Sequence, residues 1–168
     1  MKSVLLRGPL LTNSGYGVHS RQVFSWLIKR KDIDLKCQIL PWGINPWILS
    51  KKYSNNIIEK ILERSIDEKN LLIQEYDETY QVQMPEEWIK ISKKDTGITA
   101  GIESNLCNID VINNINKMDL VIVPSKFSKK CLEDTATSNK IDLKTNIVIV
   151  PESYPECFDN IKQSEVRN

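Results

Sequence analysis

A glycine-bearing loop near the N-terminus is the first place in this 168-residue chain where residue types and spacing could do chemistry. The loop Gly15-Tyr16-Gly17 follows a short apolar segment, residues 2–6, and precedes an amphipathic stretch, residues 18–30. Glycines allow the backbone to turn tightly and to approach a ligand closely, and the free N–H groups at a helix start favour phosphate. The pattern predicts either a plain tight turn or a contact with a phosphate or diphosphate.

Two side chains just after this loop could act on a ligand. His19 is the one histidine of the sequence, and it falls on the first turn of the expected helix, at its sheet-facing edge. It is either a packed, hydrogen-bonded structural residue or a functional group. Arg21 could point a permanent charge at an anionic ligand or simply cover the helix. Both residues are candidates for lining a binding cleft.

Aromatic and acidic residues follow other expected strands. Glu103 comes directly after the strand expected over residues 96–102, where a carboxylate could accept hydrogen bonds from sugar hydroxyls, act as a base, or cap the next loop. Trp42, Trp47 and Trp88 fall in loops on the same expected rim. Their large amphipathic rings could stack on sugar faces or pack the loops against the sheet. Trp42 and Glu103 therefore join the cleft-lining candidates, and Glu103 is the candidate catalytic residue.

The elements that must position these residues alternate along the chain. Strands are expected at the short apolar or alternating segments 2–6, 33–40, 79–84, 96–103, 120–123 and 147–150. Helices are expected over 18–30, from an N-cap at Ser54 through Ile66, over 109–116, and from a cap at Ser125 to about residue 134, with a helical turn over 86–89. This alternation predicts an α/β fold, a Rossmann-like three-layer sandwich with a mostly parallel sheet. Because such sheets bind ligands at the carboxyl ends of their strands, Ser125 is also a cleft-lining candidate.

Composition bounds the class of protein. The 23 basic and 22 acidic side chains nearly cancel, which argues against a nucleic-acid partner. Four cysteines stand far apart without a C-x-x-C pair and with one histidine, so we expect no metal site and ordinary thiols in a reducing compartment. No segment has the pattern of a signal peptide, and no apolar run reaches the roughly 18 residues of a membrane span. We expect a cytoplasmic protein without a transmembrane segment, for which peripheral membrane contact stays open.

Four motifs occur in an order that is specific in combination. They are Ser14 to Arg21 (SGYGVHSR), Gln83 to Trp88 (QMPEEW), Thr99 to Glu103 (TAGIE) and Met118 to Ser125 (MDLVIVPS). Together they resemble the N-terminal half of the group 1, family 4-like GT-B glycosyltransferases, over about residues 4–150. Enzymes of that family have two Rossmann-like domains that face each other across a cleft, and they move a sugar from a nucleotide donor to an acceptor.

The resemblance implies site roles residue by residue. By motif position Gly15, Tyr16 and Gly17 would approach the donor diphosphate, whose growing charge needs fixed donors and dipoles. Glu103 stands where many members of the family have a histidine, so the catalytic residue is left unassigned. No cofactor and no metal is implied, because the nucleotide sugar is a substrate.

The resemblance also implies a division of the chain and a partner. Residues 1–158 would form the acceptor-side domain, and residues 159–168 a tail or the start of an interdomain linker. We expect a hexosyltransferase type of enzyme that acts on a glycan, a lipid or another hydroxyl acceptor, and that is inactive without a C-terminal donor-binding domain in cis or in trans. The alternative is a free-standing, non-catalytic binding module of the same fold for a glycan, a nucleotide or a protein partner.

Overall fold

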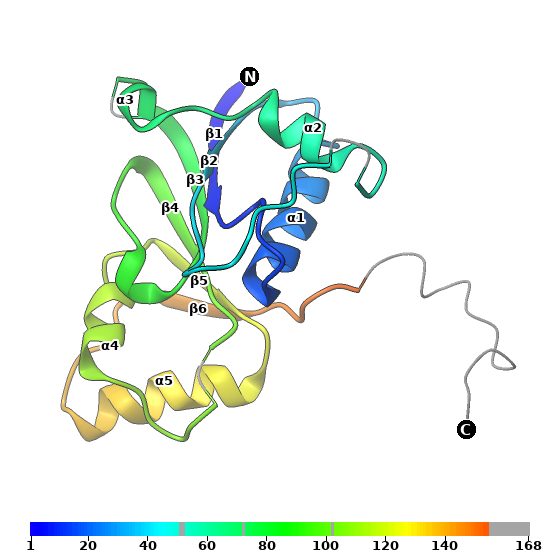
Figure 1. Ribbon diagram of the computed structural model, residues 1–168. Helices are drawn as coiled ribbons and strands as arrows, with labels where there is room; N and C mark the ends of the chain where they lie inside the picture. The colour runs from blue at the N-terminus through cyan, green and yellow to red at the C-terminus, as the bar shows by residue number, and fades with distance from the viewer. Residues whose placement is uncertain (51–52, 72, 102, 155–168) are drawn as a thin grey trace, which may run out of the picture.

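Strands and helices alternate along residues 1–50, 53–71, 73–101 and 103–154, the part of the chain that a computed structural model describes (Figure 1). The strands are β1 (Lys2–Gly8), β2 (Ile33–Ile39), β3 (Tyr76–Val82), β4 (Ser92–Ile98), β5 (Leu120–Val123) and β6 (Asn146–Ile149). The helices are α1 (Gly15–Leu27), α2 (Ile57–Leu62), α3 (Glu68–Leu71), α4 (Ile109–Ile115) and α5 (Lys126–Ser138), with a 3-10 turn η1 (Pro85–Glu87). The expected domain boundary at residue 158 and the expected tail, 159–168, lie outside the described residues.

All six strands lie parallel in one sheet, in the order β2-β1-β3-β4-β5-β6. The predicted α/β, Rossmann-like fold is confirmed, and the sheet is parallel throughout its six strands. The strand order reverses between β1 and β3, because β2 lies on one side of β1 and all later strands lie on the other. In open parallel sheets the crevice at the carboxyl ends of two such strands is the usual place for a ligand.

Helices cover both faces of the sheet. On β1, Leu6 packs in a core cluster with α1 and α2, whereas its neighbour Leu5 packs on the other face with Leu71 of α3. On β5, Ile122 packs against the first of these clusters, and Val121 belongs to a separate core with α4 and α5. Successive residues of a strand point to opposite faces, so α1 and α2 form one layer and the other three helices form the second. Figure 1 shows α1 beside α2, and α4 beside α5.

Two helix starts follow from serine caps. The Ser14 side chain accepts a hydrogen bond from the Gly17 N–H at 3.0 Å, and Ser125 accepts one from the Ser128 N–H at 3.0 Å. Each cap satisfies an N–H group that has no partner inside its own helix. The predicted cap at Ser125 is confirmed. The first helix begins at Gly15 rather than at Val18, so the glycine loop is itself the first turn of α1.

The second expected helix is shorter than its apolar stripe suggested. The predicted N-cap at Ser54 is wrong, because residues 54–56 have positive φ angles of 43°, 58° and 62° and turn the chain before the helix starts. Ile66 does not continue the stripe, since its N–H donates to the Cys37 carbonyl at 2.9 Å, and the Cys37 N–H donates to the Arg64 carbonyl at 2.8 Å. The chain pairs there with the outer edge of β2, whose unpaired backbone groups need partners.

The fourth strand also ends earlier than expected. β4 stops at Ile98 instead of reaching Glu103, although the Thr99 N–H still donates to the Ile122 carbonyl at 3.2 Å. The chain then leaves the sheet at Gly101, whose φ of +92° favours glycine and where a Cβ atom would lie 2.6 Å from the Ser128 hydroxyl. Glu103 is therefore part of an exposed loop and does not directly follow a strand.

Candidate functional site

Tyr16 connects the loops that follow four neighbouring strands. Its ring stacks on Trp42, with the ring centroids 4.4 Å apart and the planes at 22°. Its hydroxyl lies 2.8 Å from the Thr99 hydroxyl, accepts a hydrogen bond from the Ala100 N–H at 3.2 Å, and contacts the Met84 sulfur at 3.4 Å. Burial raises the pKa of the phenol, so Tyr16 stays protonated at neutral pH. We call Tyr16 and these four partners the Tyr16 cluster.

The two glycines beside Tyr16 have different reasons to be glycine. Gly17 is buried, and a Cβ atom there would lie 2.2 Å from the Thr12 carbonyl oxygen, so the close packing of α1 on the preceding loop requires it. Gly15 is exposed, and a Cβ atom there would meet nothing within 4 Å. Close packing, without any ligand, is sufficient to explain Gly17. Gly15 instead leaves open space at the start of a helix of 13 residues, where a ligand could approach the backbone.

Arg21 is directed into the protein and holds the loop between β1 and α1. One guanidinium nitrogen, Nη1, donates to the Leu10 carbonyl at 3.1 Å and to the Thr12 carbonyl at 2.7 Å. The guanidinium lies 5.7 Å from the ring centre of Tyr53, and the residue is only 6% exposed. Burial lowers the pKa of this guanidinium. Arg21 therefore supports the candidate site from behind and does not offer its charge to a ligand.

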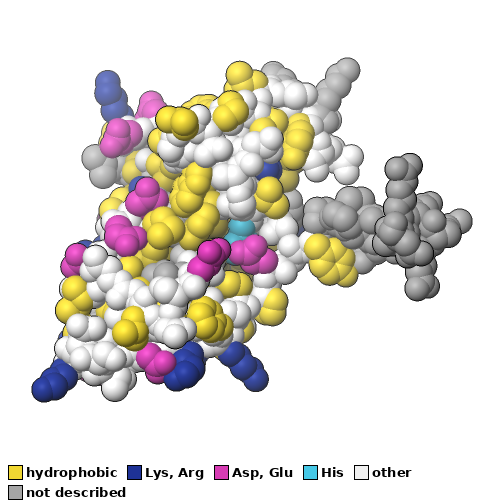
Figure 2. All heavy atoms as spheres, turned by 60° about the horizontal axis from the view of Figure 1, so that its bottom comes forward, with side chains coloured by type: hydrophobic (Ala, Val, Ile, Leu, Met, Phe, Trp, Pro, Cys, Tyr) yellow, Lys and Arg dark blue, Asp and Glu magenta, His cyan; other side chains and the backbone are white. Residues whose placement is uncertain are grey.

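His19 joins α1 to the segment that follows β6. Its Nδ1 lies 3.3 Å from a carboxylate oxygen of Glu152, and the neighbouring Gln22 amide donates to the Ser153 carbonyl at 2.6 Å. Burial lowers the pKa of the imidazole, and the Glu152 carboxylate opposes that shift without cancelling it. In Figure 2 the histidine lies beside acidic side chains, among hydrophobic ones. At neutral pH the result is a neutral His19 whose Nδ1 lies close to the Glu152 carboxylate.

The three loop tryptophans differ in position. Trp42 is half-buried in the Tyr16 cluster, and Trp47 is 46% exposed. The expectation of a rim position is wrong for Trp88, which is 3% exposed and donates its indole N–H to the Gln81 carbonyl at 3.1 Å. The Trp88 ring fills the space above Gly97, where a Cβ atom would lie 2.6 Å from it. Trp88 belongs to the core, and its place there depends on a glycine in the neighbouring strand.

The remaining candidates lie on the loops after β4 and β5. Ser125 accepts the Ser128 N–H as a helix cap, and its hydroxyl also lies 3.0 Å from the Ser128 hydroxyl, so both of these contacts are structural. Glu103 is exposed, and among the described residues no hydrogen bond or ion pair joins it to the Tyr16 cluster or to His19. The structure thus brings Gly15, Tyr16, Trp42 and His19 to one edge of the sheet and gives Glu103 no partner there.

A buried arginine beside this edge escaped the sequence interpretation. Arg7 on β1 is 6% exposed, and its guanidinium donates to the side-chain oxygens of three glutamines. These are Gln38 at 2.5 Å, Gln81 at 2.6 Å and Gln83 at 3.2 Å. Burial lowers the pKa of the guanidinium. The sequence feature that could have indicated this cluster is the presence of polar residues within otherwise apolar strands. These polar residues become neighbours only through the pairing of β1 with β2 and β3.

Two kinds of feature are absent from the described ranges. No group of three or more histidine, cysteine, aspartate or glutamate side chains in them is arranged to hold a metal ion. No helix in the same ranges has the length and apolarity needed to cross a membrane.

A comparison with known protein families, with curated proteins and with solved structures finds no match for this chain. A function must therefore be argued from the site itself.

Proposed function

We propose that this chain is the acceptor-side domain of a glycosyltransferase, which works with a donor-binding domain in cis or in trans. The observation that carries the proposal is the Tyr16 cluster at the reversal of strand order between β1 and β3. Three of the four sequence motifs that resemble such enzymes meet there through Tyr16, Met84 and Thr99. Segments that lie far apart in the sequence have one reason to converge if they serve one ligand.

The chemistry of this edge suits a sugar more than a strongly charged ligand. The Tyr16 cluster contains stacked aromatic rings, held in place by uncharged hydroxyl groups, and an aromatic, uncharged surface matches the face of a sugar. At Gly15, the first residue of α1, the space around a Cβ atom would be empty, so a phosphate group of the donor could approach the start of the helix on the same edge. The proposed site therefore has a part for the acceptor and a part for the diphosphate.

A proton acceptor is also present at this edge. The Glu152 carboxylate, 3.3 Å from Nδ1, favours the neutral tautomer of His19 that carries its proton on Nδ1, and this tautomer has a lone pair on the other ring nitrogen, Nε2. Such a pair can take the proton from an acceptor hydroxyl as the new glycosidic bond forms. In the proposal His19, and not Glu103, is the general base, because Glu103 has no partner to orient it among the described residues. A cytoplasmic location, where the thiols of the sequence stay reduced, is part of the same proposal.

A binding experiment tests the site. We would titrate the isotopically labelled chain with a panel of glycans and of UDP-, GDP- and ADP-sugars, and follow amide signals by NMR. We expect a glycan to shift the amide of Ala100 and a sugar nucleotide to shift the amide of Gly15. Tyr16→Phe removes the hydroxyl that positions the Thr99 hydroxyl and the Ala100 N–H, and we expect a loss of about 1 kcal/mol of binding free energy, which is a roughly five- to tenfold weaker affinity.

The matched control is Tyr80→Phe. Tyr80 also loses a hydrogen-bonded hydroxyl, which donates to Glu78 at 3.3 Å on β3, outside the Tyr16 cluster. We expect its glycan affinity to equal that of the unchanged chain. Glycan binding that leaves the Ala100 amide unchanged would overturn the site, and multiple-turnover sugar transfer by this chain alone would overturn the acceptor-side assignment.

A further inference from the structure

Two cysteines from different elements meet at one face of α5. Cys107 lies at the end of the loop between β4 and α4, and its N–H donates to the Thr135 hydroxyl at 3.0 Å. Its thiol donates to the same oxygen at 3.4 Å. The Thr135 hydroxyl in turn donates to the carbonyl of Cys131, one helical turn earlier, at 2.7 Å. Since residues four apart share one face of a helix, the Cys107 sulfur lies against the face that carries Cys131.

The two thiols also interact with each other. Burial raises the pKa of Cys131, and the hydrogen bond and charge of Cys107 raise it further. Cys131 is 2% exposed, whereas Cys107 is half-buried and is the more accessible residue of the two. Cys37 differs from both, because it is fully buried in the other core and burial alone raises its pKa to about 12. Cys107 is therefore the thiol that reacts first, and Cys131 is placed to react with it.

We propose that Cys107 and Cys131 are a redox pair that forms a reversible disulfide between the loop 103–108 and α5. The oxidant is a small disulfide of the oxidised-glutathione class. The Cys107 thiolate attacks one sulfur of that disulfide, forms a mixed disulfide and releases one small thiolate. The Cys131 thiolate then attacks the Cys107 sulfur and releases the second one. The two protein thiols lose two electrons and their protons, and the small disulfide gains them as two thiols.

The bond would act on the candidate site through the loop. Residues 103–108 follow Ala100 and Gly101, and Gly101 packs against Ser128 on the same helix, α5. A disulfide at Cys107 would fix both ends of this loop to α5. In a reducing compartment such a bond is transient and regulatory. The inference rests on the two thiols alone and does not depend on the proposed function.

Peptide mapping tests the pair in a Cys157→Ser background, because Cys157 lies outside the described residues. The folded chain is incubated with oxidised glutathione, its free thiols are alkylated, and the peptides are identified by mass spectrometry. We expect loss of two free thiols in most molecules, a Cys107–Cys131 cross-linked peptide, an unmodified Cys37, and full reversal by dithiothreitol. Amide hydrogen exchange of residues 103–108 should slow on oxidation, whereas exchange in β1 should not change.

The control variant is Cys131→Ala, in which a glutathione mixed disulfide should accumulate on Cys107. Three results would each overturn the proposal. The first is a mixed disulfide that persists on Cys107 in the parent chain as it does in the variant. The second is a cross-link that forms as readily in the urea-unfolded chain as in the folded chain. The third is amide exchange of residues 103–108 that is unchanged after the bond has formed.

Discussion

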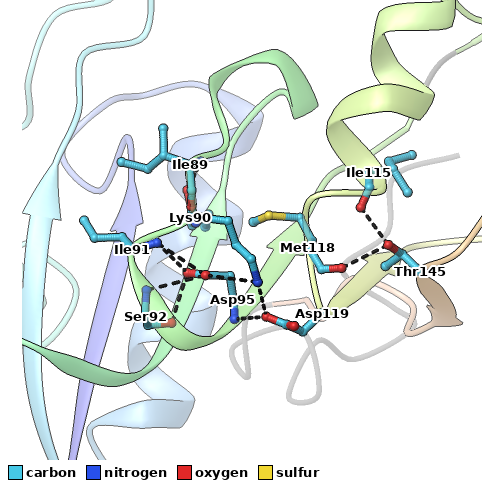
Figure 3. A network of polar contacts seen from close by, with 10 residues as sticks. Ile89, Lys90, Ile91, Ser92, Asp95, Ile115, Met118, Asp119 and Thr145 are labelled. Carbon is cyan, nitrogen blue, oxygen red and sulfur yellow. Dashed lines mark hydrogen bonds and ion pairs between the residues drawn. The ribbon is translucent and has the colours of Figure 1, made fainter.

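At the amino ends of β4 and β5, which we call the amino edge of the sheet, the polar side chains are oppositely charged and pair with one another. At the carboxyl ends of β1, β3 and β4, which we call the carboxyl edge, the polar side chains are mostly neutral and surround Tyr16. Asp95 at the amino edge is fully buried and accepts hydrogen bonds from the Ser92 hydroxyl at 3.0 Å and from the Ile91 N–H at 3.3 Å (Figure 3). Lys90 lies 2.8 Å from Asp119 and 3.8 Å from Asp95.

The difference teaches where this chain keeps groups for a ligand. At the amino edge the Asp95 N–H donates to the Asp119 carboxylate at 2.8 Å, and the hydrogen bond from Lys90 lowers the pKa of that carboxylate. These charges are satisfied by the chain itself. At the other edge Gly15 is open, and the direct hydrogen-bond partners of the Tyr16 hydroxyl are uncharged. We therefore expect amino-edge substitutions to change stability alone, and carboxyl-edge substitutions to change binding.

The largest expected effect is at Asp95. Asp95→Ala leaves the N–H groups of Ile91 and Ser92 without their acceptor inside the protein, which should lower the free energy of unfolding by about 3 kcal/mol. Urea denaturation measures the loss. The exposed Asp142→Ala should change the free energy by no more than about 0.5 kcal/mol. The contrast between the edges fails if the folded Asp95→Ala chain binds glycans differently from the unchanged chain.

The next effect separates the two glycines. Gly17→Ala forces a Cβ atom against the Thr12 carbonyl and should cost about 2 kcal/mol of unfolding free energy. Gly15→Ala meets open space, so its stability should stay within about 1 kcal/mol, while its affinity for sugar nucleotides falls. Denaturation and calorimetric titration of the two variants measure these quantities. An equal loss of stability in both would show that the space at Gly15 is not open.

A smaller effect is expected at Ser125. Ser125→Ala removes the cap of α5 and should lower the free energy of unfolding by about 1 kcal/mol, because the Ser128 N–H loses its acceptor. Ser138→Ala, at the exposed end of the same helix, should have almost no effect. Ligand affinity should be unchanged in both variants. A drop in ligand affinity confined to Ser125→Ala would show that Ser125 does contribute to ligand binding.

The smallest effect is the pH dependence from His19. Burial holds the folded pKa of His19 below its unfolded value of 6.5, so its neutral form stabilises the fold above that pH, and the stabilisation is lost as the pH falls. Between about pH 7.5 and about pH 5.5 the unchanged chain should lose more unfolding free energy than His19→Gln. Denaturation at both pH values measures this. The reverse order would mean that attraction by Glu152 outweighs burial.

The sequence predicted five of the six strands to within about three residues, because short apolar runs bounded by proline or glycine carry a strong local signal. The strand β4, whose first half is polar, begins four and ends five residues earlier than expected. It also predicted the cap at Ser125, which depends on residues three apart. It misjudged Ser54, where three residues with positive φ angles precede the helix, and Ile66, which pairs with β2. In both places the tertiary environment overrides a local pattern of apolar spacing.

The candidate site was predicted less completely than the fold. Gly15, Tyr16, His19 and Trp42 were found because glycines, histidines and tryptophans after strands stand out in any sequence. Met84 and Thr99 belong to two of the quoted motifs, but neither their contacts with Tyr16 nor that of Glu152 with His19 was predicted, since nothing local marks which residues will meet. Arg21 and Trp88 stood out equally, but the fold turns both inward.

The amino-acid sequence by itself determined the alternation of strands and helices, and hence the parallel sheet with helices on both faces. The spacing of apolar residues and the capping of helices depend on residues close together in the chain, so both can be recognised in the sequence. Only the tertiary structure decided which conspicuous side chains face outward and which glycine is needed for packing. That decision depends on strand pairing and on the filling of space between segments as far apart as Tyr16 and Thr99, which no local pattern records.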